Sequence, residues 1–158
     1  GNLMLAFARH PDQWQRLRTQ PNLLPRAFEE GLRWDSTVQT FFRTTSREVQ
    51  TPEGPIPEGS KVVLFLAAAN RDPRRWADPT RFDIGRQASG HVGFGFGIHQ
   101  CLGQMVARQE VEVLLRAMLP RVGAIRLTGQ PERRINNTLH ALATLPLEFE
   151  PVSQGGEI

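Results

Sequence analysis

The sequence predicts a mainly helical α+β fold that carries small β-sheets. Apolar residues recur at helical spacing in two stretches, 24–34 and 102–119. Between them, residues 38–49 and 61–66 are rich in Thr, Phe and Val and are separated by Pro and Gly, which is typical of a small hairpin. Residues 70–90 contain Asp-Pro turns and no sustained period, which indicates an ordered meander. These observations favour a single unit over the whole chain.

The boundaries of the N-terminal helices follow from prolines and from missing caps. Residues 1–9 resemble the last turns of an apolar helix with no start signal, so we expect the sequence to be cut from a longer chain. Pro11 at a first helical position predicts a helix to about Thr19, which Pro21 ends. A second helix then runs to Trp34.

The later elements are predicted from turns and short apolar runs. The hairpin turns at the Thr-Pro-Glu-Gly sequence of residues 51–54. The long amphipathic helix ends at Pro120, because proline cannot continue a helix. Short extended pieces are expected at 124–127, 134–139 and 147–150, and a frayed tail is expected at 154–157.

Composition narrows the classes of protein that this chain can represent. With 39% hydrophobic and 22% charged residues, the 158 residues can bury one ordinary core. Lys61 is the only lysine among 19 basic residues, and a net charge of +3 is too mild to indicate nucleic-acid binding. A single cysteine excludes an internal disulfide framework. No signal peptide or membrane-length apolar run is evident, so we expect a cytoplasmic protein.

The single cysteine, Cys101, lies where a glycine-rich segment meets the start of the amphipathic helix. Unpaired N–H groups and the helix dipole at a helix N-terminus stabilise a thiolate, which can bind iron. Gly93, Gly95 and Gly97 allow a flat ligand to approach the main chain, and Phe94 adds an aromatic face. The alternative is a cysteine that is simply a small buried apolar residue.

The residues around this cysteine form a specific pattern, Phe94-x-x-Gly97-x-x-x-Cys101-x-Gly103, with a histidine two residues before the cysteine. Random placement of 9 Phe and 14 Gly in 158 residues would produce the Phe and Gly positions about five times in ten thousand. The pattern resembles the haem-ligand loop of the cytochrome P-450 superfamily, the haem-thiolate monooxygenases.

This resemblance implies haem b (iron protoporphyrin IX) as the cofactor, with Cys101 as both the axial iron ligand and the catalytic residue. His99 and Arg43 match positions that bind the haem propionates, whose burial requires charge-assisted hydrogen bonds. The cofactor-binding residues that the resemblance implies are Arg43, Phe94, Gly95, His99, Cys101 and Gly103.

A second motif, Glu30-Gly-Leu-Arg33, matches the Glu-x-x-Arg motif of the same superfamily. Glu and Arg three residues apart are also common on solvated helix faces, so the motif by itself is compatible with a surface pair. The resemblance implies instead a buried ion pair that braces the meander, with Arg81 completing the network.

A narrower resemblance concerns the substrate. The stretches 38–45, 69–76, 89–95 and 133–139 are similar to a bacterial group that oxidises para-substituted benzoates such as 4-methoxybenzoate. In that group Val38 and Phe41 would line the substrate pocket. Ordinary strand packing is the alternative for both side chains.

The resemblance covers residues 1–158 but corresponds only to the C-terminal, haem-proximal part of the family's fold. It implies a monooxygenase that uses O2, with electrons from a ferredoxin and its NAD(P)H-dependent reductase, to hydroxylate or O-demethylate a small aromatic acid. Arg108 matches a ferredoxin-contacting position. We expect the chain alone to be inactive, because the oxygen-binding helix is missing. The alternatives are a non-catalytic haem-binding fragment and an interaction domain whose Cys101 is merely buried.

Overall fold

The computed structural model describes residues 1–153, and the tail expected to fray at 154–157 lies outside them. Five α-helices and two 3-10 turns are present in the described part of the chain. Their bounds are α1 (Asn2–Arg9), α2 (Pro11–Thr19), η1 (Pro21–Leu23), α3 (Leu24–Trp34), α4 (Leu66–Ala69), η2 (Gly97–His99) and α5 (Gln104–Met118).

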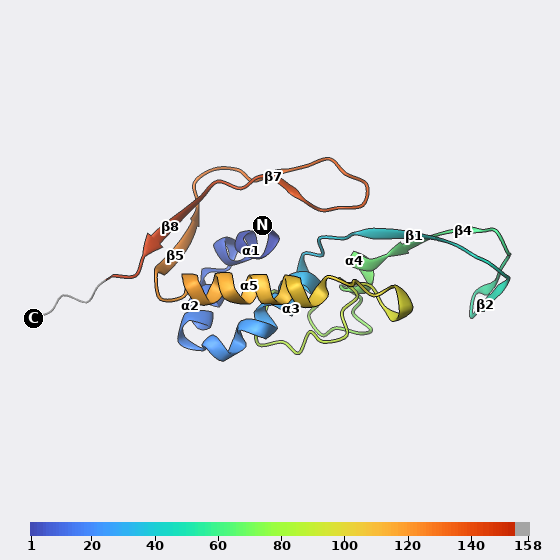
Figure 1. The fold of residues 1–158 in the computed structure, drawn as a ribbon, viewed down its shortest axis with the longest axis horizontal. Coiled ribbons are helices and arrows are strands. Elements are labelled where there is room, and N and C mark those ends of the chain that lie inside the picture. Colours follow the sequence, from blue (N-terminus) through green and yellow to red (C-terminus); the bar gives the residue numbers. More distant parts are fainter. Residues whose placement is uncertain (154–158) are drawn as a thin grey trace, which may run out of the picture.

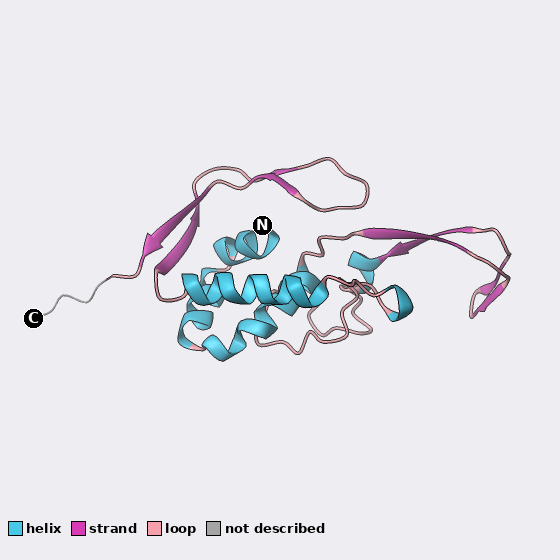
Figure 2. Ribbon diagram, viewed as in Figure 1, coloured by secondary structure: helices cyan, strands magenta, loops and turns pink. Residues whose placement is uncertain are grey.

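The strands form four separate antiparallel pairs. The pairs are β1 (Thr40–Thr44) with β4 (Lys61–Phe65), β2 (Val49–Thr51) with β3 (Gly54–Ile56), β5 (Val122–Leu127) with β8 (Leu147–Pro151), and β6 (Glu132–Arg133) with β7 (Leu142–Thr144). The helices gather in the centre around α5, the β1–β4 hairpin extends at one end, and β5 and β8 lie at the other (Figure 1). Figure 2 shows that long loops fill the region between α3 and the hairpin.

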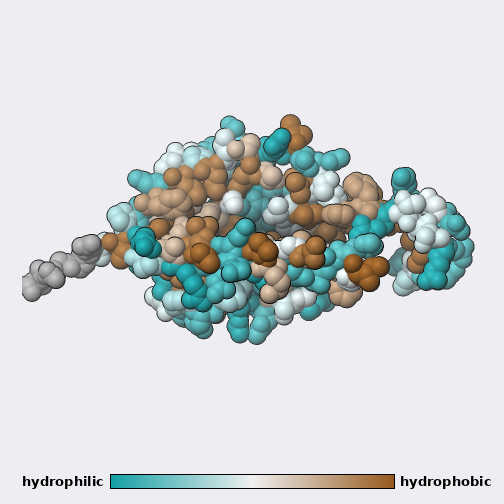
Figure 3. All heavy atoms as spheres, viewed as in Figure 1, coloured by the Kyte–Doolittle hydropathy of each residue, from teal (hydrophilic) through white to brown (hydrophobic). Residues whose placement is uncertain are grey.

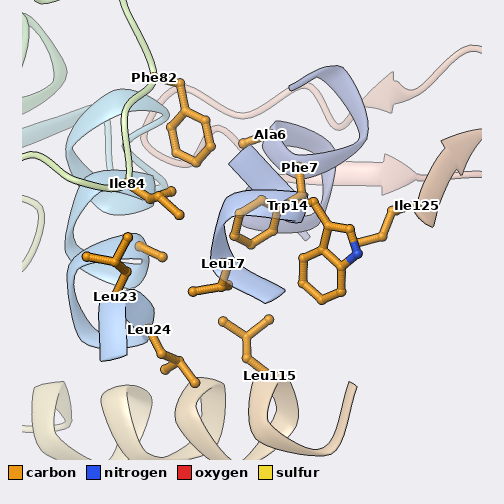
Figure 4. Packing of buried hydrophobic residues seen from close by; sticks show 11 residues of the cluster. Ala6, Phe7, Trp14, Leu17, Leu23, Leu24, Phe82, Ile84, Leu115 and Ile125 are labelled. Carbon is orange, nitrogen blue, oxygen red and sulfur yellow. The ribbon is translucent and has the colours of Figure 1, made fainter. Parts of the chain in front are cut away.

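The core lies where α1, α2, α3 and the meander meet one face of α5 (Figure 4). Phe7 and Trp14 pack edge to face with ring centroids 5.2 Å apart, and Phe82 of the meander lies 5.9 Å from Phe7. The buried members of this cluster are Ala6, Phe7, Trp14, Leu17, Leu23, Leu24, Ala27, Phe82, Ile84, Leu115 and Ile125. The apolar spacing seen in the sequence therefore builds one continuous core on one side of the chain.

Helix α5 buries much less of its apolar surface than its amphipathic pattern predicts. Leu115 is its one fully buried residue, whereas Met105, Val106, Val113 and Leu114 are exposed. Apolar side chains accordingly lie open on the surface in the central part of the molecule (Figure 3). Leu115 lies on the face of α5 that packs on the core. Helix α5 contacts α3 there, and its other faces stay open.

The predicted helices at 11–19 and 24–34 and the hairpin of residues 38–66 are confirmed. The expected strand over 61–66 is one residue too long, because Leu66 begins the short helix α4. The expected extended piece at 134–139 is wrong: apart from an isolated bridge at Leu139 these residues form a loop, and the pairing occurs at β6 and β7 instead.

Candidate functional site

The Cys101 loop, residues 94–103, is closed by hydrogen bonds of its own backbone. The amide of Cys101 donates to the carbonyl of Phe94 at 2.8 Å, and the amide of Gln100 donates to the carbonyl of Gly97 at 3.0 Å. Gly95 and Gly97 take φ values of 75° and 70°, which residues with a Cβ rarely adopt. The loop thereby folds into two tight turns that end just before α5.

The thiol of Cys101 is exposed, so the alternative of a buried structural cysteine is wrong for this structure. Three apolar side chains of the same loop are also open: Phe96 is 86%, Ile98 98% and Leu102 99% exposed. A Cβ added at Gly97 would meet nothing within 4 Å. The loop therefore presents one sulfur on an open, apolar, glycine-lined face.

This donor set fits haem. Within residues 1–153 no three His, Cys, Asp or Glu side chains come together as a cage for a bare metal ion. A porphyrin brings its own four equatorial nitrogens, so a single thiolate is all that the protein must add on this side. The apolar side chains around the sulfur suit the flat hydrocarbon surface of a macrocycle.

Glu30 and Arg33 form an ion pair that is completely buried, as the resemblance implied and a surface pair would not be. Arg33 Nε donates to Glu30 Oε2 at 2.7 Å and Nη2 donates to Oε1 at 2.9 Å. Nη1 of Arg33 reaches the carbonyls of Asn70 and Pro79, both at 2.9 Å. The guanidinium thus ties the meander to α3 with every donor direction occupied.

The arginine that completes this network is Arg86, which corrects the expectation for Arg81. Arg86 Nε donates to Glu30 Oε1 at 3.2 Å, and its side chain is 14% exposed. The side chain of Arg81 is 64% exposed, and only its carbonyl takes part, accepting from Arg33 Nη2 at 3.2 Å. Both arginines lie in the meander, and only its tertiary path decides which one points inward.

Arg43 and His99, the expected propionate-binding residues, are free of ion pairs within residues 1–153. Arg43 lies on β1, where its guanidinium sits 5.0 Å from the ring centroid of Phe41 and donates to the carbonyl of Phe42 at 2.8 Å. His99 is exposed at the end of η2, two residues before Cys101. Both side chains remain available to an anionic group.

The residues expected near the substrate meet a distant part of the chain. Val38 forms a bridge with Leu139, and the amide of Gln39 donates to the carbonyl of Thr138 at 2.8 Å. An open hollow of about 490 Å³ lies beside this junction. Its lining includes Thr40, Phe65, Ala67 and Ala68 and the loop residues 134–137 and 139–140, but neither Val38 nor Phe41. Sequence reasoning missed the lining residues, because the contact joins segments about a hundred residues apart.

Comparison with known proteins decides the family, since the Cytochrome P450 family model matches residues 5–151. The chain belongs to the cytochrome P450 family. It is 56% identical over 145 residues to cytochrome p450 CYP199A2 of Rhodopseudomonas palustris, a match that covers 92% of this chain and 35% of that protein. It is 40% identical to a beta-dihydromenaquinone-9 omega-hydroxylase of Mycobacterium bovis, covering 96% of this chain and 31% of the relative.

Solved structures agree. P450BioI, crystallised in complex with acyl carrier protein bearing hexadec-9Z-enoic acid, matches with a TM-score of 0.90 at 37% identity, over 94% of this chain and 39% of that one. The tirandamycin C-bound P450 monooxygenase TamI matches with a TM-score of 0.89 at 39% identity, over 95% of this chain and 39% of that one.

These matches confirm the predicted family and the mainly helical fold with small sheets. Proteins of this family bind haem b through a cysteine thiolate. The chain spans about a third of the length of the curated relatives named here, 35% and 31%. In the part of the chain that the structure describes, no helix is both long and apolar enough to cross a membrane.

Proposed function

We propose that residues 1–158 form the haem-proximal portion of a bacterial cytochrome P450 monooxygenase that oxidises a small para-substituted aromatic acid. The observation that carries the proposal is the exposed Cys101 thiol on a glycine-turned loop with exposed apolar side chains, and the buried Glu30–Arg33 pair supports it. The overall reaction inserts one atom of O2 into a C–H bond and releases the other as water, with two electrons and two protons supplied. Oxidation of a methoxy carbon would release formaldehyde and leave a phenol.

Haem held by a cysteine thiolate supplies oxygen activation, because the thiolate pushes electron density onto the iron. Cys101 would hold the iron through its sulfur, and Phe94, Gly95 and Gly103 would help to hold the haem. Arg43 and His99 would donate charge-assisted hydrogen bonds to the propionates. Neither donor forms an ion pair within the described residues, which supports this assignment.

The substrate class rests on the resemblance of four stretches to the benzoate-oxidising group, with Val38 and Phe41 as pocket residues. Phe41 is half exposed on β1, next to the hollow beside Thr40.

A ferredoxin and its NAD(P)H-dependent reductase would supply electrons. Arg108 would contribute to the ferredoxin contact, and the expected cytoplasmic location belongs to the same proposal. Residues 1–158 alone would not turn over substrate.

The first test is a carbon monoxide difference spectrum of the reduced protein, with Cys101→Ala as the control. A red-shifted thiolate band that disappears in Cys101→Ala supports the ligand assignment. Haem bound with the same spectrum in both proteins would refute it. Adding 4-methoxybenzoate to the intact enzyme with its redox partners and measuring formaldehyde then tests the substrate class, which fails if no formaldehyde forms.

The second candidate is a haem-binding fragment without catalysis. The open apolar surface of Ile98, Leu102 and Met105 favours it for residues 1–158 taken alone. A thiolate band without any substrate oxidation, in the intact protein supplied with its redox partners, is the result expected of it.

A further inference from the structure

A second group of interacting side chains includes the first residue of the Cys101 loop, Phe94. We name it the Glu29 cluster: Glu29, His91, Phe94 and Arg108. Glu29 on α3 contacts His91 Nε2 through Oε2 at 2.7 Å. Arg108 on α5 donates from Nε to Glu29 Oε1 at 2.6 Å and from Nη2 to Oε2 at 3.3 Å. One carboxylate therefore joins α3, the loop before the cysteine and α5.

The histidine of this cluster is oriented by the main chain. The amide of Gly93 donates to His91 Nδ1 at 2.9 Å, which leaves Nε2 as the protonated nitrogen that donates to Glu29. The side chain of His91 is only 3% exposed. A Cβ at Gly93 would lie 3.0 Å from His91 Nδ1, so glycine keeps room for the ring.

The aromatic member links the cluster to the cysteine. The guanidinium of Arg108 lies 4.9 Å from the ring centroid of Phe94, and the rings of Phe28 and His91 each lie 6.2 Å from it. The carbonyl of Phe94 accepts the amide hydrogen of Cys101 at 2.8 Å. The ring that Arg108 and His91 hold thus belongs to the residue whose backbone holds the cysteine.

Glu29 is ionised in this setting. Burial would raise its pKa, but the hydrogen bonds from His91 and Arg108 and the positive charge of Arg108 lower the pKa from 4.5 to about 2. The Arg108 side chain forms an ion pair with this carboxylate and is 32% exposed, so its guanidinium group points inward at Glu29.

We propose that Glu29 is a positioning residue for the thiolate: through His91 and Arg108 it immobilises Phe94, and Phe94 fixes the Cys101 backbone toward the haem iron. The inference rests on the proposed function for its haem readouts. It assigns to Arg108 a structural task within the chain, which is distinct from contact with a ferredoxin. Outer-shell hydrogen bonds of this kind orient metal ligands and tune their potentials.

The test uses the intact protein with Glu29→Gln, which keeps the shape of the side chain and removes its charge. Arg108→Lys is the second variant, because it keeps the charge and loses the fork. The matched control is Glu112→Gln on α5, the helix of Arg108. It removes the charge from an exposed pair in which Arg116 Nη2 lies 2.8 Å from Glu112 Oε1. Amide hydrogen exchange at Cys101 is measured against exchange at Ala27 in the core, so that a general loss of stability is recognised.

Both test variants are expected to accelerate exchange at Cys101 about tenfold relative to Ala27, since each loses charge-assisted hydrogen bonds. Arg108→Lys is also expected to weaken the thiolate carbon monoxide band and to shift the haem reduction potential more than Glu112→Gln does. Equal acceleration at Cys101 and Ala27, or no change beyond the control, would overturn the inference.

The exchange measurement needs no bound haem. If the unmodified intact protein lacks a thiolate band, the proposed function fails while exchange at Cys101 still decides whether Glu29 holds the loop.

Discussion

The Glu30–Arg33 pair and the Cys101 loop differ strongly in burial and in how many of their polar groups find a partner within the chain. Arg33 is fully buried and bonded to Glu30 and to backbone carbonyls of the meander, whereas Ile98 and Leu102 beside the thiol are almost fully exposed. The buried pair needs nothing further for its hydrogen bonds. The loop instead leaves its chemically active atom and its apolar side chains open.

This difference separates the residues that stabilise the chain from Cys101, the proposed haem ligand. A buried charge is expensive unless it is paired, so removing one partner should act mainly on the free energy of unfolding. An exposed glycine-turned loop contributes little burial, so changes there should act mainly on the environment of the sulfur. The Glu29 cluster lies between the two, because the partly buried Glu29 carboxylate on α3 contacts His91 in the loop before the cysteine and Arg108 on α5.

The largest effect is expected at the buried pair. Arg33→Ala leaves the Glu30 carboxylate buried without its bidentate partner, which should lower the free energy of unfolding by about 3–5 kcal/mol. Urea unfolding of the intact protein followed by circular dichroism measures it. Arg116→Ala, in an exposed pair with Glu112, should cost about 0–1 kcal/mol and serves as the control. A cost for Arg33→Ala no greater than the control's would show that the pair does not brace the meander.

A smaller effect tests which meander arginine belongs to the network. Arg86→Ala removes a charge-assisted hydrogen bond to the buried Glu30 and should cost about 1.5–3 kcal/mol. Arg81→Ala keeps its backbone carbonyl and removes only an exposed side chain, so it should cost about 0.5 kcal/mol or less. The same unfolding experiment compares them. The reverse order of the two costs would restore Arg81 as the network arginine.

At the loop, Gly95→Ala should cost about 1–2 kcal/mol, because alanine resists a φ of 75°. The added Cβ would lie 3.5 Å from the carbonyl oxygen of His99, which is an ordinary contact. Gly59→Ala, with the same φ of 75° and nothing within 4 Å, is the matched control in the distant hairpin. Both should lose stability, but only Gly95→Ala should change the alkylation rate of Cys101, the single cysteine. Equal alkylation rates would contradict the role given to the loop geometry.

The last effect concerns pH. Because the folded pKa of Glu29 is about 2 and its ordinary value is 4.5, ionised Glu29 stabilises the fold fully above about pH 4.5. This stabilisation is lost as the pH falls from 4.5 toward 2. The difference in unfolding free energy between the unmodified protein and Glu29→Gln should therefore shrink over that interval and stay constant above it. A difference that does not vary with pH would contradict the pairing of Glu29 with His91 and Arg108.

Much of the fold and of the site could be predicted from local sequence. Prolines at helix starts, apolar periods and the Phe-x-x-Gly-x-x-x-Cys-x-Gly pattern predicted α2, α3, the β1–β4 hairpin and the family, because these signals act over a few residues. The same is true of the two tight turns at Gly95 and Gly97, whose positive φ values only glycine adopts readily.

The rest depended on the tertiary path. No local signal distinguishes Arg86 from Arg81, or shows that Glu29 would lie within reach of Arg108, 79 residues away. Periodicity likewise predicted an apolar face on α5, but not that only the Leu115 side would meet the core. Backbone preference and residue spacing determine which elements form and which atom can bind a metal. Which charges pair and which faces are buried is decided by contacts between distant segments, and those exist only once the chain has folded.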